Sequence, residues 1–164
     1  MDKKIYELEA HDIGEFNFTT NQLKKIKSNE SYMLTIYSNE NSGLIPLLYK
    51  IIKLLTDEEQ SILFLSLYQD EAGFIKRYNR DSYGNVPDTL RIVDSIETFK
   101  ELNLENLDYD VVIIDNIDII SEKDYFINQL KQHGKTIICG CRELNKNNYN
   151  SFADEFIHLF IQEK

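Results

Sequence analysis

The sequence predicts an α/β protein in which a mainly parallel central sheet lies between layers of helices. Short apolar runs alternate along the chain with segments whose apolar residues recur every three or four positions. This alternation is typical of strand–helix–strand units, which build parallel sheets covered by helices. The run at 110–115 is the strongest strand signal, because its unbroken β-branched residues indicate a central strand that is buried on both faces.

The first half of the chain contains two predicted strands, each followed by a predicted helix. In order, these elements are a strand at 32–37, a helix at 44–55, a strand at 62–67 and a short helix at about 70–78. Leucine and isoleucine recur with helical spacing through 44–55, and Pro46 suits the first helical turn, where its missing N–H costs nothing. Residues 81–88 combine glycine, asparagine and proline and predict a surface loop.

The second half of the chain repeats the same alternation. In order, the predicted elements are a strand at 90–93, a helix at 95–102, a strand at 110–115, a helix at 121–133, a strand at 136–141, an exposed loop at 145–150 and a last strand at 156–161. We expect Ser95 to cap the first of these helices and Gly134 to end the second. No linker or repeat divides the chain, which predicts a single domain over residues 1–164, with residues 1–30 as an N-terminal lead-in segment.

Charge and composition exclude several classes of protein. The chain has 18 Lys and Arg residues against 28 Asp and Glu residues, a formal net charge of −10, and its one small basic cluster lies at 24–27. Such a chain is unsuited to coating nucleic acid or an anionic membrane surface, and no apolar run reaches the roughly 18 residues that span a bilayer. Cys139 and Cys141 are too close together for an ordinary disulfide, so we expect them in the core of a reduced, cytoplasmic protein.

The polar segment between the first strand and its helix stands where a phosphate-binding loop would lie. In P-loop nucleotide hydrolases this loop reads Gly, four residues, Gly, Lys, then Ser or Thr; the lysine neutralises the terminal phosphates and the hydroxyl holds the magnesium ion. Here the same spacing gives Ser38, four residues, Gly43, Leu44 and Ile45. An apolar pair neither balances phosphate charge nor ligates a metal. We therefore interpret the segment as a degenerate phosphate loop, with an ordinary polar turn as the alternative.

A second segment has the form of the strand that carries the magnesium-associated aspartate in P-loop enzymes. Residues 111–114 are apolar, and Asp115 follows them directly. Asp115 is thus the Walker B-like residue of this chain. We expect it to be either a remnant of a metal site or a hydrogen-bond acceptor at the edge of the core.

The order of these pieces resembles the RecA-like ATPase core, and most of all that of the bacterial replicative hexameric helicases of the DnaB type. The segments that carry the likeness, each altered from the family pattern, are 62–67 with Tyr68 in place of the catalytic glutamate, 110–120 with the metal-associated aspartate, 142–146 in place of Ser-Gln-Leu-Asn-Arg, and Ala153-Asp154 before the strand at 156–161. The likeness covers about residues 14–164 and implies a three-layer RecA-like P-loop fold. Initiator and helicase-loader ATPases share this order but often carry a second acid where Asn116 stands, and both branches stay open.

The departures from the family pattern point in one direction. The phosphate lysine, the magnesium hydroxyl and the catalytic glutamate are all absent from the matching positions. Loss of the group that activates water, and of charge stabilisation at the phosphates, would each slow hydrolysis by orders of magnitude. The resemblance therefore implies a pseudo-ATPase that has no catalytic residues and requires neither a cofactor nor a metal.

These observations predict a catalytically inactive RecA-like domain that binds protein, as a regulatory or accessory subunit linked to DNA replication or to a helicase or related ATPase. RecA-like subunits stack side by side, and Arg142, Glu143 and Lys146 are candidate interface residues. An acidic surface would suit the basic side of such a partner. One alternative is a divergent ATPase that takes a cation, such as Arg142 or Lys146, from a neighbouring subunit; another is a structural subunit that associates with itself. We expect no direct binding to nucleic acid or membrane.

The acidic residues around the strongest strand suggest a further alternative, a two-metal nuclease site. That site would need Asp110, Asp115, Asp118 and Asp124 to converge. Asp110 and Asp115 begin and end the same strand, which places them about 16 Å apart. We therefore interpret these residues as solvated acids at strand ends.

Overall fold

The fold is built on one parallel sheet. The structure, a computed structural model, describes residues 3–28, 30–38, 43–103, 108–142 and 152–162. The strands of this sheet are β1 (Lys4–Glu9), β2 (Met33–Tyr37), β3 (Ile62–Leu65), β4 (Leu90–Val93), β5 (Val111–Ile114), β6 (Thr136–Cys141) and β7 (Glu155–Phe160). They lie in the order β1-β7-β2-β6-β5-β3-β4, and every neighbouring pair is parallel. All carboxyl ends therefore meet at one edge, where β6 separates the end of β2 from the end of β5.

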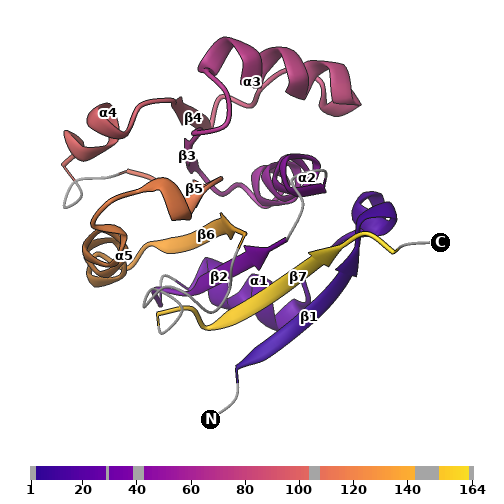
Figure 1. Cartoon of the computed structure of the whole chain (residues 1–164), viewed down its shortest axis with the longest axis horizontal. Helices are drawn as coiled ribbons and strands as arrows, with labels where there is room; N and C mark the ends of the chain where they lie inside the picture. The colour runs from indigo at the N-terminus through magenta and orange to yellow at the C-terminus, as the bar shows by residue number, and fades with distance from the viewer. Residues whose placement is uncertain (1–2, 29, 39–42, 104–107, 143–151, 163–164) are drawn as a thin grey trace.

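Helices cover both faces of this sheet (Figure 1). The α-helices are α1 (Thr20–Lys27), α2 (Leu44–Asp57), α3 (Glu71–Tyr78), α4 (Ile96–Lys100) and α5 (Lys123–Gln132). The first three pack on one face through one apolar cluster, and α4 and α5 pack on the other face through a second cluster. This arrangement confirms the predicted α/β architecture with its parallel sheet between helical layers.

The ends of the helices follow from local side-chain chemistry. Thr19 caps α1 with a capping box that includes Gln22, and Asp70 caps α3 by accepting a hydrogen bond from the Gly73 N–H. Ser95 caps α4 as predicted, accepting from the Thr98 N–H at 3.2 Å. Gly134 follows α5 with a φ of 73°, a conformation that glycine adopts without strain, which confirms the predicted end of that helix.

Each strand and helix predicted within residues 32–141 is present, with ends that differ by a few residues. The predicted last strand is also present, as β7. Part of the loop expected at 81–88 is instead a π-helix, η3 (Asn79–Tyr83), that continues α3. The loop expected at 145–150 lies outside the described residues.

Residues 1–30, expected as a lead-in segment, contribute three elements to the fold. These are β1, the short 3₁₀ helix η1 (Ala10–Glu15) and α1. Along the whole of β1, residues pair in parallel with β7, from Lys4 with Glu155 to Glu9 with Phe160. An edge strand of this kind has one neighbour and only partial burial, so its sequence has no continuous apolar run.

Candidate functional site

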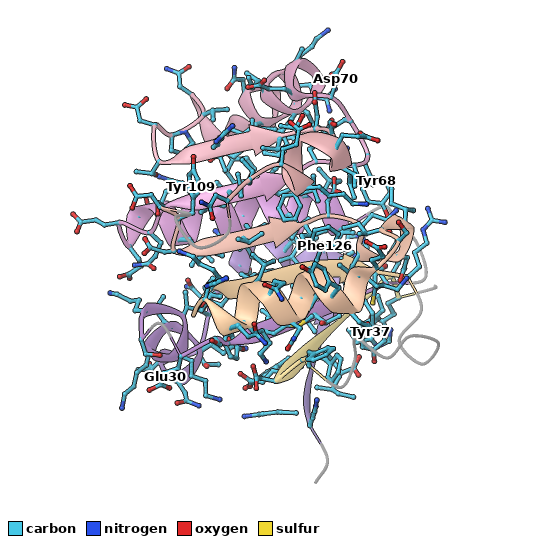
Figure 2. All side chains as sticks on the ribbon, turned by 90° about the vertical axis from the view of Figure 1, so that its left-hand side faces the viewer. Glu30, Tyr37, Tyr68, Asp70, Tyr109 and Phe126 are labelled. Carbon is cyan, nitrogen blue, oxygen red and sulfur yellow. The ribbon has the colours of Figure 1, made fainter. Side chains whose placement is uncertain are left out.

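The carboxyl edge of the sheet is where an open α/β fold places its ligands. Figure 2 shows Tyr37 and Tyr68 at this edge, and Glu30 and Tyr109 at the opposite, amino edge. The ends of β2, β5 and β6 and the start of α2 meet at the carboxyl edge, together with the described residues of the degenerate phosphate loop. The chemistry of this edge depends on which side chains fill the space between α2 and the sheet.

Ser38 and Gly43 are the described residues on either side of the degenerate loop. Ser38 is buried, and its N–H donates to the Cys141 carbonyl at 3.1 Å, which extends the pairing of β2 with β6 by one residue. Gly43 precedes α2 and provides no side-chain cap. A Cβ at Gly43 would lie 3.0 Å from Leu159 Cδ2 and 3.4 Å from both Ala10 Cβ and Ile13 Cδ1. Hydrocarbon from β7 and from η1 therefore covers the backbone where the helix begins.

Leu44 and Ile45, which the spacing assigns to the lysine and hydroxyl positions, both belong to the core. Only 3% of Leu44 and 5% of Ile45 is exposed. Leu44 lies over Gly140, because a Cβ built on that glycine would approach Leu44 Cδ2 and the Asp115 carbonyl oxygen to 2.7 Å each. The side chain thus fills the space between the first turn of α2 and the end of β6. At this position the chain presents packed hydrocarbon to any phosphate.

Asp115 is fully buried at the end of β5, with its carboxylate directed at the backbone of the neighbouring strand's loop. One oxygen accepts from the Leu67 N–H at 2.8 Å and the other from the Tyr68 N–H at 3.3 Å. Burial raises the pKa of Asp115 from 3.8 to about 6, although these two hydrogen bonds oppose the rise. Of the two roles expected for Asp115, the contacts match that of a hydrogen-bond acceptor at the edge of the core.

Tyr68 and Arg142 form a polar cluster beside Asp115. The Arg142 side chain is hydrogen-bonded to the Tyr68 hydroxyl, and the Arg142 N–H donates to Asp118 Oδ2 at 2.8 Å. Burial raises the pKa of Tyr68, although Arg142 opposes the rise. Tyr68 therefore stays a neutral phenol near pH 7 and is no substitute for a carboxylate that activates water. Glu143 and Lys146, the other candidate interface residues, lie outside the described part of the chain.

The acids considered for a nuclease site are spread over both edges of the sheet. Asp110 lies at the amino edge, where it accepts hydrogen bonds from the backbone and hydroxyl of Ser61 at 2.9 and 3.0 Å. Within the described ranges, no group of three or more His, Cys, Asp or Glu residues is placed to hold a metal ion. The described part of the chain also contains no helix that is long and apolar enough to cross a bilayer.

The side chains that cover Gly43 were not among the predicted site residues. Ala10 and Ile13 come from η1, and Leu159 comes from β7, which is 116 residues further along the chain than Gly43. Neither segment has a motif that would link it to the loop. Only the pairing of β7 with β1 and β2 brings them together.

Comparisons with known proteins identify the fold. No protein-family model and no curated protein sequence matches the chain. Among solved structures, the flagellar accessory protein FlaH from Methanocaldococcus jannaschii is similar with a TM-score of 0.60 and 15% identity, over 87% of this chain and 78% of FlaH. The KaiC-like protein PH0186 from Pyrococcus horikoshii OT3 is similar with a TM-score of 0.59 and 16% identity, over 82% of this chain and 74% of that protein.

The chain has a RecA-like fold. Both structural neighbours have the RecA-like P-loop ATPase fold, and their similarity extends over most of each chain. This confirms the RecA-like core that the sequence resemblance implied. At 15% and 16% identity the likeness concerns the fold alone, and neither neighbour is described as a helicase.

Proposed function

We propose that this chain is a RecA-like domain that does not hydrolyse nucleotide and that acts by binding another protein. The observation that carries the proposal is the apolar packing at the start of α2. Leu44 fills the space beside Gly140, while Leu159 and Ile13 cover Gly43. In a phosphate-binding loop the same place presents backbone N–H groups, an ammonium group and a hydroxyl to the nucleotide.

The acid and the aromatic residue beside this packing support the same proposal. Both carboxylate oxygens of Asp115 are engaged by backbone N–H groups of its own chain. Tyr68, at the position of the catalytic glutamate, carries a phenol whose pKa is raised by burial. Neither Asp115 nor Tyr68 therefore offers an unengaged carboxylate to a magnesium ion or an attacking water.

We propose a RecA-like ATPase as the partner, with the replicative helicase of the same cell as the first one to test. The sequence resemblance to DnaB-type helicases supports this choice, and a chain that keeps the RecA-like fold keeps surfaces by which such domains stack. Arg142 is exposed at the carboxyl edge and stays the described candidate for that interface. Co-sedimentation of the two purified proteins, followed by the helicase's rate of ATP hydrolysis, tests the partner directly.

Nucleotide binding at the start of α2 is the decisive measurement. Amide chemical shifts of Gly43, Leu44 and Ile45 should stay unchanged in millimolar ATP with magnesium, and no phosphate should be released. Magnesium-dependent shifts at these amides, or turnover, would overturn the proposal. Binding that appears only as the protein concentration rises would instead favour an ATPase completed by a neighbouring subunit.

A double variant tests whether the side chains of Leu44 and Ile45 alone prevent nucleotide binding, or whether the residues packed around them also do so. Leu44→Lys with Ile45→Thr restores the missing cation and hydroxyl at the predicted register. If the folded variant binds ATP, the two apolar side chains alone account for the inactive site. If it folds but does not bind ATP, we infer that the side chains of Leu159, Ala10 and Ile13 next to Gly43 also prevent nucleotide binding.

A further inference from the structure

A second polar site lies at the opposite end of the sheet, beside α1 and the amino ends of β1 and β7. It is a hollow of about 340 Å³. Its lining combines cationic, aromatic, amide and acidic side chains: Lys3, Lys4, Tyr6, Asn21, Lys25, Asp154 and Glu155. Tyr37, at the end of β2, lies at the other, carboxyl edge of the sheet, whereas Glu30 lies at this amino edge (Figure 2).

Several lysines gather here, beside acidic residues, although the chain as a whole carries a net charge of −10. Three lysines line the main hollow. An adjoining hollow of about 260 Å³ shares Asn21 and Lys25 with it and adds Lys24 and the acid Glu30, so part of the basic cluster seen in the sequence borders the same region. A third hollow, of about 150 Å³, also meets the first at Lys25. Lys25 is thus the central cation of the region.

The two acids in the lining have partners within the protein. Glu155 is 4% exposed, and its oxygens accept hydrogen bonds from the Tyr6 hydroxyl at 2.8 Å and the Tyr32 hydroxyl at 2.5 Å. Burial alone would raise the pKa of Glu155, but these two hydroxyls, with Lys25 and Lys4, lower it overall. Asp154 Oδ2 accepts from the Met33 N–H at 2.8 Å and lies 3.5 Å from the Lys131 ammonium.

The same contacts position two of the three lysines, Lys4 and Lys25, around the hollow. Lys25 Nζ lies 3.7 Å from Glu155 Oε1 and 5.6 Å from the centre of the Tyr32 ring. Lys4 Nζ lies 4.8 Å from the centre of the Tyr6 ring, so the two tyrosines that bind Glu155 also contact the cations. Fixed ammonium groups lose less side-chain entropy when a ligand binds.

We propose that this hollow binds a small polyanion that carries two neighbouring phosphate groups. Three lysines outnumber the two acids in the lining, and both acids already have partners within the protein, so the hollow favours an anionic group; lysine binds phosphate as a compact point charge. The volume lies at the lower end of the range of small-molecule sites, roughly 300–1,000 Å³. The site is independent of nucleotide hydrolysis, because it shares no residue with the start of α2.

Calorimetric titration with pyrophosphate, in the absence of magnesium, tests the proposal on the whole chain. We expect binding that weakens as the salt concentration rises, because salt screens the attraction between exposed charges. Lys4→Gln and Lys25→Gln should each weaken binding roughly tenfold, the effect of losing one charge-assisted hydrogen bond. Lys76→Gln changes an exposed lysine on α3, a helix that contributes no residue to the hollow; it is the matched control and should leave binding unchanged.

Amide chemical shifts locate the ligand and distinguish binding in this hollow from binding at the start of α2. Pyrophosphate should shift the amides of Lys4, Tyr6, Asn21 and Lys25 and leave those of Gly43 and its neighbours in place. Because Lys25 also contacts Glu155, the folded state of its variant is checked by thermal unfolding, and exposed Lys4 gives an answer that does not depend on that contact. Absence of binding at millimolar pyrophosphate, shifts elsewhere, or equal weakening by Lys76→Gln would overturn the proposal.

Discussion

Replacing Asp115 with asparagine should change how the stability of this protein depends on pH. The carboxylate is buried at the end of β5, and its pKa rises from 3.8 to about 6 because burial disfavours its charged form. Asparagine has nearly the same shape and carries no titrating group. The difference in unfolding free energy between the variant and the wild type therefore isolates the ionisation of this one side chain.

The magnitude and the sign of this effect follow from the two pKa values. One pKa unit corresponds to about 1.4 kcal/mol, so a rise from 3.8 to about 6 makes ionisation of Asp115 cost the folded state about 3 kcal/mol. The folded protein binds this proton more tightly than the unfolded chain does. The contribution of Asp115 to stability is therefore fully present below pH 3.8 and is lost as the pH rises through about 6.

Urea unfolding of both proteins at a series of pH values from about 4 to 8 measures this contribution. The variant should gain about 3 kcal/mol relative to the wild type across that range, with most of the change complete by neutral pH. Asparagine accepts from only one of the two N–H groups with its oxygen, which adds an offset that does not vary with pH. A difference that stays constant with pH, or that falls as the pH rises, would refute the assignment of Asp115 as a buried, destabilised carboxylate.

Three further predictions concern the packing around that edge. Gly140→Ala should lower the unfolding free energy by about 1–3 kcal/mol in urea titrations, because its Cβ would lie 2.7 Å from a backbone carbonyl, whereas Gly14→Ala, with no atom within 4 Å, should cost far less. Leu44→Ala should cost about 2–5 kcal/mol, the usual effect of emptying a buried leucine site, and a loss below 1 kcal/mol would contradict the packing described. Cys139 and Cys141 are both buried, and burial raises the pKa of Cys139, so a thiol reagent should modify neither until the protein unfolds.

Four of the strands that were predicted correctly share one physical property. β2, β3, β5 and β6 are covered by helices on both faces, so their sequences are almost entirely apolar, apart from Thr35 in β2 and Thr136 and Gly140 in β6, and can be recognised without any knowledge of their neighbours. β1 lies at the edge of the sheet, and charged residues alternate with apolar ones along it. Its place in the fold is set by its pairing with β7, which no local pattern encodes.

In the candidate site, too, local sequence predicted some features, whereas others depend on segments that are distant along the chain. The spacing alone predicted that Leu44 and Ile45 stand at the cation and hydroxyl positions, and this register stays a prediction. The apolar side chains next to Gly43 are Leu159 and Ile13, which belong to β7 and η1. The contacts of Asp115 were equally inaccessible to sequence reasoning, because they are made with backbone N–H groups of the segment after β3, and every sequence supplies such groups.

The backbone partners of Asp115 also explain how an acid can persist at this position without metal chemistry. The Leu67 and Tyr68 N–H groups are directed at a fully buried side chain, so an apolar residue there would leave two donors unsatisfied. Each unsatisfied buried group costs about 1–3 kcal/mol, which is comparable to the cost of ionising the buried carboxylate. A Walker B-like aspartate is therefore no guide to hydrolysis in a chain of this kind. Leu44 is the more informative residue, because phosphate binding requires a cation at the position that the spacing assigns to it, whereas the side chain there is apolar and buried.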